Sequence, residues 1–262
     1  MTCEKFCVKC CPNFLIMIFT AMISTPTLAL IFPEILRHCS NYMICCFFYF
    51  INFLLFFMFL WSWFYASFSD PGRIVDDLQK RGYLQRIQRG DIPYCLSRLK
   101  ICPICQVPMP LNSRHCEECN ACCLRHDHHC GMLGNCVGDK NTKAFILALF
   151  YSSLFCFYSI FVEIYYLFIY QNFSEANKSP IGFLMIMAGV YTFVIGVTML
   201  IFSFHMTNSI FGELGKIKKK SVSIQKLFKL FGSNWWERIT PIQKETTYFA
   251  WPGVSWSNEF EL

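Results

Sequence analysis

Cysteine, histidine and aspartate residues are concentrated in the 35 residues from Cys102 to Cys136. The set consists of Cys102, Cys105, His115, Cys116, Cys119, Cys122, Cys123, Asp127, His128, His129, Cys130 and Cys136. Thiolates and imidazoles at such short intervals are the ligands that tetrahedral zinc takes from polypeptide turns. Eight of these residues would close two zinc sites, and the remainder includes a cysteine next to a histidine and an aspartate. The stretch therefore predicts a metal-stabilised platform that holds a reactive thiol.

Composition and hydropathy indicate a membrane protein. Apolar residues make up 55% of the chain and charged residues 15%, whereas soluble proteins are roughly one quarter charged. Four apolar runs stand out, at residues 14–32, 43–68, 144–170 and 181–204. The shortest would form a helix about 28 Å long, close to the roughly 30 Å of a hydrocarbon layer. We therefore predict an all-α membrane protein with four transmembrane helices and the Cys-rich stretch between the second and third.

The distribution of positive charge predicts the orientation. With four spans, both termini and the loop at residues 69–143 share one side, and they hold 21 of the 23 Lys and Arg residues, leaving Arg37 and Lys178 opposite. Basic loops stay in the cytosol, so the Cys-rich loop and the termini are expected there. That compartment keeps thiols reduced, and the 17 cysteines indicate metal binding and acyl attachment instead of a disulfide framework. The net charge of +6 follows from this asymmetry, and no nucleic-acid partner is expected.

Four segments follow from the apolar runs: 1–68 with the first two spans, 69–143 with the Cys-rich domain, 144–204 with the last two spans, and a tail at 205–262. We expect a short polar helix at 74–91 and hairpins with metal knuckles after it. Residues 223–231 predict a basic amphipathic helix on anionic lipid. Glu163 faces either the bundle interior or the far headgroups, and Cys45 is expected to act as a small hydrophobe. Candidate S-acylation sites near the N-terminus are Cys3, Cys7, Cys10 and Cys11.

At Asp127-His128-His129-Cys130 the sequence resembles the DHHC family of protein S-acyltransferases. The likeness covers most of the chain, including Asp70-Pro71-Gly72 after the second span and Asn135-Cys136-Val137-Gly138 with Asn141 and Phe145. The spacing alone indicates two metal sites but does not show which ligands belong to which site. The resemblance implies that one structural zinc is held by Cys102, Cys105, His115 and Cys122, and the other by Cys116, Cys119, His129 and Cys136. It assigns no role to Cys123, and His126 is expected to be a solvated neighbour.

The resemblance also implies a reaction. Cys130 would be the nucleophile, His128 would take its proton, and Asp127 would orient the imidazole. A long-chain acyl-CoA such as palmitoyl-CoA would acylate Cys130, and the acyl group would pass to cytosolic juxtamembrane cysteines of substrate proteins. A chain lying in a pocket among the spans would gain about 0.8 kcal/mol per buried CH2. A Golgi or endoplasmic-reticulum membrane is expected, although the tail carries no retention signal.

Several positions depart from the family pattern. Gly131-Met132 stand where the family has Pro-Trp, and Met109 and Asn112 stand where it has two cations for the CoA phosphates. Arg114, helped by Arg98 and Lys100, is the candidate replacement for those cations. The family's Thr-Thr-x-Glu is represented only by Thr207-Asn208-Ser209. An alternative hypothesis is therefore a weakly active or inactive zinc-stabilised scaffold or accessory subunit, which would need the zinc ligands but not Asp127, His128 and Cys130.

Overall fold

The computed structural model describes residues 42–169, 180–218, 231–232, 234–243, 250–251 and 254. The chain forms two compact units. One contains Phe64–Phe145 with the described residues of Phe211–Leu262, and the other contains the described residues of Cys10–Trp63 and Ile146–Ile210. The first predicted span at 14–32, the N-terminal cysteines, Arg37, Lys178 and nearly all of the predicted amphipathic helix at 223–231 lie outside the described residues.

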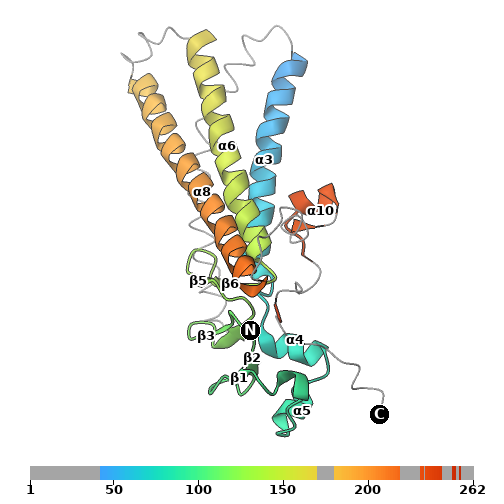
Figure 1. Cartoon of the computed structure of the whole chain (residues 1–262). Helices are drawn as coiled ribbons and strands as arrows, with labels where there is room; N and C mark the ends of the chain where they lie inside the picture. Colours follow the sequence, from blue (N-terminus) through green and yellow to red (C-terminus); the bar gives the residue numbers. More distant parts are fainter. Residues whose placement is uncertain are drawn as a thin grey trace, which may run out of the picture. The chain divides into compact units, whose positions relative to one another are not determined.

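Three long helices, α3 (Tyr42–Phe68), α6 (Thr142–Ile169) and α8 (Pro180–Lys218), make up most of the helical unit (Figure 1). Each is long and apolar enough to cross a membrane. The Tyr158 hydroxyl of α6 donates to the Phe48 carbonyl of α3 at 2.9 Å, and the Ser203 hydroxyl of α8 donates to the Ile146 carbonyl of α6 at 3.4 Å. These contacts hold three of the four predicted spans together within the described part of the chain.

The helix that contains the fourth predicted run continues beyond the end of that run. Its hydropathy falls after residue 204, but α8 continues to Lys218, because no proline interrupts residues 205–218 and helix geometry requires no apolar side chains. Thr207-Asn208-Ser209 therefore lies within a helix, where the Thr207 hydroxyl donates to the Ser203 carbonyl one turn back.

The structure decides one open alternative in the helical unit and contradicts one expectation. Glu163 is 8% exposed, and a Cβ on Gly189 would lie 2.7 Å from its Oε2, so the glycine of α8 makes room for a carboxyl that faces the bundle interior. Cys45, near the beginning of α3, is disulfide-bonded, and the expectation that it is only a small hydrophobe is wrong. The hydropathy of the run could not reveal this pairing.

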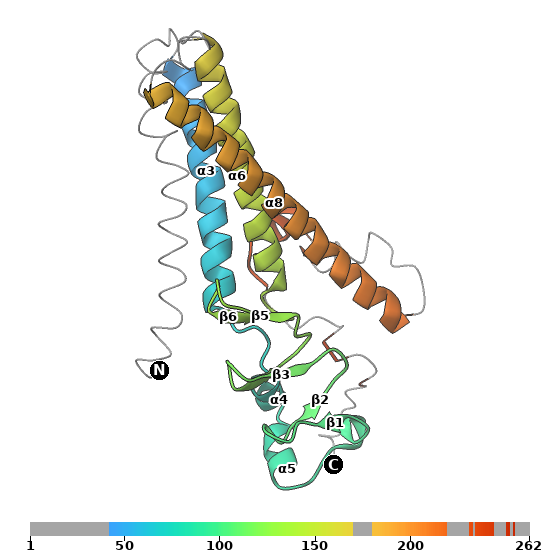
Figure 2. The same ribbon diagram turned by 90° about the vertical axis from the view of Figure 1, so that its left-hand side faces the viewer.

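The Cys-rich unit consists of short elements. Two helices, α4 (Ile74–Lys80) and α5 (Leu84–Gln88), and a 3-10 turn η2 (Tyr94–Leu96) precede three antiparallel hairpins (Figure 2). The hairpins are β1 (Lys100–Ile101) with β2 (Pro108–Met109), β3 (Arg114–Cys116) with β4 (Ala121–Cys123), and β5 (His128–Cys130) with β6 (Asn135–Val137). The expected hairpins are present, so this unit adds six strands to the predicted all-α class.

The single polar helix predicted over 74–91 is wrong. A turn at Arg81–Gly82, with Gly82 at φ 76°, separates α4 from α5. Ile74 and Leu78 are fully buried in a cluster that includes Leu96, Val107 and Leu124. The two helices therefore bury an apolar face against the hairpins, which a single continuous helix over the segment would not do.

The end of α3 is tied to the last hairpin by side-chain amides. Asn135 donates from Nδ2 to the carbonyls of Ala66, Ser67 and Ser69 at 2.9 to 3.3 Å. Asn141 donates to the Ala66 and Cys136 carbonyls at 3.0 and 2.8 Å and accepts from the Gly138 N–H. Carbonyls at a helix C-terminus have no partner within the helix, so these amides satisfy them and fix β6 to the end of α3.

Asp70-Pro71-Gly72 completes this junction. The Asp70 carboxylate accepts from the Gly72 and Arg73 N–H groups at 3.0 Å and pairs with Lys140 at 3.0 Å. Gly72 has φ 102°, a conformation open chiefly to glycine. The chain thereby leaves the helix in a fixed direction, and the Gly72 carbonyl accepts from the Leu124 N–H after β4.

The described residues that follow α8 belong to the Cys-rich unit. Helix α10 (Trp235–Ile239) begins with a capping box between Asn234 and Glu237. The Lys143 ammonium donates to the Glu237 and Ile242 carbonyls, and the Trp251 indole, 4% exposed, donates to Asp77 of α4 at 2.8 Å. The tail therefore contributes to the core of this unit.

Candidate functional site

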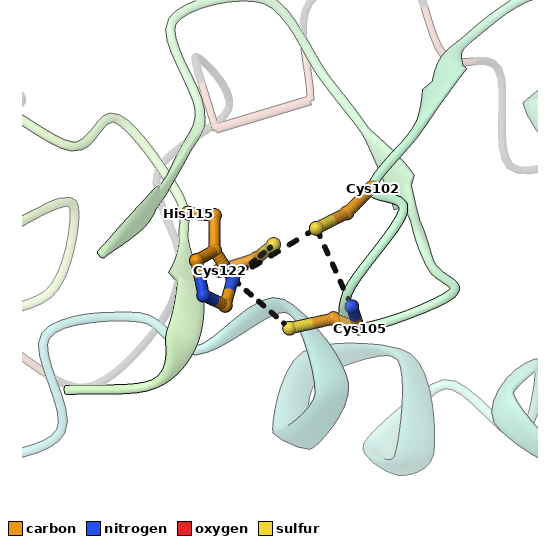
Figure 3. Close-up of side chains that lie close together, drawn as sticks. All are labelled: Cys102, Cys105, His115 and Cys122. Carbon is orange, nitrogen blue, oxygen red and sulfur yellow. Dashed lines mark hydrogen bonds between the residues drawn. The ribbon is translucent and has the colours of Figure 1, made fainter. Parts of the chain in front are cut away.

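The first Cys/His cluster lies between the first two hairpins (Figure 3). Cys102 and Cys105 come from the turn after β1, and His115 and Cys122 face each other across β3 and β4. The four side chains converge, with the three sulfurs 3.8, 3.3 and 3.7 Å from His115 Nδ1. The sulfur of Cys102 also accepts the Cys105 N–H at 3.4 Å.

The second cluster repeats this arrangement one hairpin later. Cys116 ends β3 and Cys119 lies in the turn after it, and His129 faces Cys136 across β5 and β6. Their sulfurs lie 3.6, 3.4 and 3.7 Å from His129 Nδ1. The other ring nitrogen, Nε2, contacts the Glu118 carboxylate at 2.9 Å, an outer contact typical of metal-bound histidine.

These donor sets fit zinc. Tetrahedral zinc with sulfur at about 2.3 Å and nitrogen at about 2.0 Å places the two kinds of atom about 3.6 Å apart, and the observed separations lie on both sides of that value. Each group offers three thiols and one imidazole, with all donor atoms within 4.8 Å of one another. Two compact Cys3His groups compatible with two zinc ions are therefore present, in the sets that the family resemblance implies.

Cys130 belongs to neither cluster. It ends strand β5, on which His129 points to the second cluster and His128 lies next to Asp127. Asp127 Oδ2 and His128 Nδ1 are 2.6 Å apart, and the Cys130 thiol lies close enough to His128 to shift its pKa. The His128 ring also packs edge-on against Phe145, with centroids 5.9 Å apart. The strand thus carries an Asp–His–Cys series beside a metal ligand.

The three groups shift one another's protonation. The hydrogen bond with Asp127, followed by that with Cys130, raises the pKa of His128 to about 9, and the same contact lowers the pKa of Asp127. Burial acts to raise the pKa of the Cys130 thiol, but the nearby His128 side chain and the N–H groups of Leu133 and Met132 outweigh it, so that pKa lies below its ordinary value. The site favours a thiolate paired with an imidazolium.

Two residues near the site, His126 and Cys123, have buried side-chain atoms. Both ring nitrogens of His126 are buried and lack a hydrogen-bond partner in the described part, so the expectation of a solvated side chain is wrong; burial lowers its pKa. The Cys123 thiol is buried and donates to the Pro71 carbonyl at 3.4 Å. A Cβ on Gly138 would lie 2.5 Å from its sulfur, so Cys123 fills the space that Gly138 leaves.

Arg114 lies exposed at the beginning of β3, opposite Cys123. After burial, its charge is the next largest cause of the lowered pKa of His126, which places it near the segment that leads into β5. Arg98 and Lys100 are exposed as well.

Sequence reasoning missed Glu118, which supports His129 and whose only signal was a carboxylate inside a Cys-x2-Cys turn. Asn135 was noted for its family motif, but its bonds to the carbonyls of Ala66, Ser67 and Ser69, at and just after the end of α3, depend on a contact distant in sequence.

Comparison with known proteins gives consistent results. The family model described as DHHC palmitoyltransferase matches residues 96–219. The chain is 39% identical over 98 residues to palmitoyltransferase pfa3 of Aspergillus fumigatus, covering 35% of this chain and 18% of that protein. It is 30% identical over 165 residues to probable protein S-acyltransferase 12 of Arabidopsis thaliana, covering 59% and 57%. It is 32% identical over 133 residues to palmitoyltransferase ZDHHC2 of Homo sapiens, covering 43% and 36%.

The matched stretch contains both Cys/His clusters, the whole Asp127–Cys130 series and all of α6 and α8. The aligned part spans well under two thirds of each of these curated relatives. The clusters, the Asp127–His128–Cys130 series and the apolar helices α6 and α8 all lie in the stretch that is similar to DHHC palmitoyltransferases.

Proposed function

We propose that the protein is a membrane-bound protein S-acyltransferase that moves a long-chain acyl group, palmitoyl above all, from acyl-CoA to cysteines of substrate proteins. The observation that carries the proposal is the Asp127–His128–Cys130 series, in which Asp127 holds His128 at 2.6 Å and the Cys130 thiol lies near the imidazole, on a strand whose remaining histidine belongs to a Cys/His cluster. The scaffold alternative requires the clusters but gives no reason for this series to be intact.

The resting pair already carries the charges that the reaction needs. With the pKa of His128 raised to about 9 and that of Cys130 lowered, the proton resides on the imidazole and the sulfur is a nucleophile. Asp127 holds Nδ1, which directs Nε2 toward the reacting sulfur. The Asp127 and His128 side chains remain about one third exposed, at 34% and 35%, which leaves the site accessible to a polar CoA.

Acyl transfer then takes two balanced steps. The Cys130 sulfur attacks the thioester carbonyl, the new S–C bond forms, the bond to the CoA sulfur breaks, and His128 gives its proton to the departing CoA thiolate. In the second step His128 takes the proton of a substrate cysteine, whose sulfur attacks the acyl group and releases the Cys130 thiolate. The first step leaves His128 neutral, as the second step requires, and the second step returns a proton to His128, as the first step requires.

The two metal ions would be structural. Cys102, Cys105, His115 and Cys122 would hold one, and Cys116, Cys119, His129 and Cys136 the other. Four protein ligands leave no coordination position for a substrate, so each zinc would cross-link the segments that hold it and take no part in the reaction. The second site fixes His129 between His128 and Cys130, so it orients the reacting strand.

The Cys-rich unit would lie in the cytosol. The distribution of basic residues supports this side, and so does the disulfide at Cys45 near the opposite, N-terminal end of α3, since disulfides persist in oxidising compartments. With a first span at residues 14–32 the protein would have four transmembrane helices. A Golgi or endoplasmic-reticulum membrane is the proposed location.

The acyl-CoA phosphates would be bound by exposed cations, Arg114 foremost. Replacing Arg114 by Ala should raise the KM for acyl-CoA several-fold with little change in kcat, because a solvent-exposed ion contact is worth roughly 1 kcal/mol or less. An unchanged KM at low and high salt would remove Arg114 from the site.

The proposal is tested by incubating the full-length protein in detergent with palmitoyl-CoA and locating the acyl group by mass spectrometry. A hydroxylamine-labile acyl group on Cys130 that passes to an acceptor thiol is expected. Cys130→Ser should abolish the label and retain two zinc ions per chain. Cys123→Ser is the matched control, because its thiol is close in sequence, buried and outside both clusters, and it should still label at Cys130. No label on a protein that keeps both metals would favour the scaffold alternative.

A further inference from the structure

The Cys-rich domain contains an internal repeat of 14 residues. Each ligand of the second cluster follows its counterpart in the first by 14 positions: Cys102 and Cys116, Cys105 and Cys119, His115 and His129, Cys122 and Cys136. Cys130 in turn follows Cys116 by the same 14 positions. The proposed nucleophile therefore occupies the position of the first metal-binding cysteine in a third copy.

The hairpins share this register. Lys100 pairs with Met109, Arg114 with Cys123, and His128 with Val137, so both members of each pair advance by 14 residues. The two residues of each pair are nine positions apart in all three hairpins. Cys102 directly follows β1, and Cys116 and Cys130 are the last residues of β3 and β5. The three turns are equivalent by backbone pairing as well as by sequence.

The turns also share their backbone conformation. The fifth residue of each, Gln106, Asn120 and Gly134, has a positive φ of 56°, 47° and 60°. In the first two turns the leading sulfur accepts the N–H of the residue three positions on, at 3.4 Å. In the third, the N–H of Leu133 at that same position donates to the Cys130 carbonyl at 3.0 Å. The third turn therefore shares the register and the backbone conformation of the two metal turns.

The third copy lacks most of the donors. Leu133, fully buried, stands where the first two turns have Cys105 and Cys119. The next two ligand positions fall in α6 and are Lys143 and Phe150, and the Lys143 ammonium is bonded to tail carbonyls. One histidine remains close, because His128 contacts Cys130 and is held by Asp127, much as His129 is held by Glu118.

We infer that the turn from Cys130 to Gly134 is a third zinc knuckle without its metal, and that Leu133 is the positioning residue that keeps the Cys130 sulfur out of metal coordination and available to an acyl group. The inference deepens the proposed function and rests on Cys130 being its nucleophile. A second thiolate at position 133 would complete a Cys-x2-Cys pair, and His128 would make a third ligand. Three protein ligands and a solvent molecule suffice for tetrahedral zinc.

Leu133→Cys tests this directly. The full-length variant is purified with a phosphine reductant and zinc, and metal is counted by mass spectrometry alongside acyl labelling of Cys130. We expect three zinc ions per chain in place of two and at least about a tenfold loss of label, because coordination occupies the sulfur lone pairs that attack the thioester. Leu133→Ser is the matched control, since it loses the same packing with a side chain of cysteine's size; it should keep two zinc ions and label better than the cysteine variant.

The double variant Leu133→Cys with Cys130→Ser identifies the ligand, and it should return to two zinc ions. Two ions in Leu133→Cys, a third ion that survives loss of Cys130, or a loss of label equal to that in Leu133→Ser would each overturn the inference. The metal count is read independently of activity. If the wild-type protein failed to label, the function proposal would fail while the third metal could still be counted.

Discussion

The two Cys/His clusters have the same four donors in the same register, but their surroundings differ. Cys102 and Cys122 of the first are part of a large buried cluster with Ile74, Leu78 and Trp251. The buried cluster around the second consists of cysteines, namely Cys116, Cys123 and Cys136 with Cys119 packed against them. Apolar burial contributes about 25 cal/mol per Å², so the first cluster has a hydrophobic core to support it and the second depends chiefly on its metal.

The two clusters also differ in how close their ligands lie to the reacting residues. His129 of the second cluster is the central residue of β5, between His128 and Cys130. The first cluster has no residue on that strand. We infer that the second metal orders the reacting strand directly, whereas the first stabilises the domain on which the strand is built.

The largest expected effect is therefore in the second cluster. Cys119→Ala should lose one zinc per chain and reduce acyl labelling of Cys130 by about 100-fold or more, because an unanchored His129 lets the neighbouring pair leave its geometry. Zinc counting and labelling of the same preparation measure both quantities. Retained labelling with one zinc lost would mean that the strand is held by its hairpin bonds alone.

Replacing Asp127 by Asn separates orientation from charge on the same strand. The Asp127 carboxylate raises the pKa of His128 to about 9, and a neutral amide would let that pKa fall. The imidazolium would then stabilise the Cys130 thiolate less, the pKa of Cys130 would rise, and labelling near neutral pH should drop by about 100-fold. The rise of rate with pH should also move to higher pH, as measured by single-turnover labelling from about pH 6 to pH 9. An unchanged profile with both zinc ions bound would contradict the assigned charge states.

Cys105→Ala is the matched change in the first cluster, since Cys105 and Cys119 hold equivalent, half-buried positions. It should also lose one zinc, but the hydrophobic core remains, so we expect labelling to fall by only about tenfold together with a lower unfolding temperature. Thermal unfolding and labelling at a temperature below both transitions give the comparison. An equal loss of label in the two variants would show that the core around the first cluster does not compensate for its metal.

The sequence could predict what depends on residue type and spacing, and less of what depends on surroundings. Cys130 and its two partners were identifiable because three unusual residue types are adjacent in the chain, and apolar length identified three of the long helices. The break between α4 and α5 could not be predicted from the sequence, because it depends on the packing of Ile74 and Leu78 against a core that later hairpins form. The burial of His126 and the bonds from Asn135 to α3 have the same origin, since both require contacts between segments distant in sequence.

In the second cluster a carboxylate outside the four donors, that of Glu118, contacts the histidine ligand. Glu118 contacts Nε2 of His129 at 2.9 Å, but its side chain is 71% exposed, so solvent weakens the contact. Glu118→Gln keeps a hydrogen-bond acceptor and removes the charge, and it should lower zinc affinity at the second site by about tenfold, the low end for such partners. Competition with a chelator should then release one zinc early and one at the wild-type concentration, with labelling unchanged when zinc is in excess. Simultaneous release of both ions would mean that the two sites are coupled through the shared β3–β4 hairpin, and the separation of their roles would not hold.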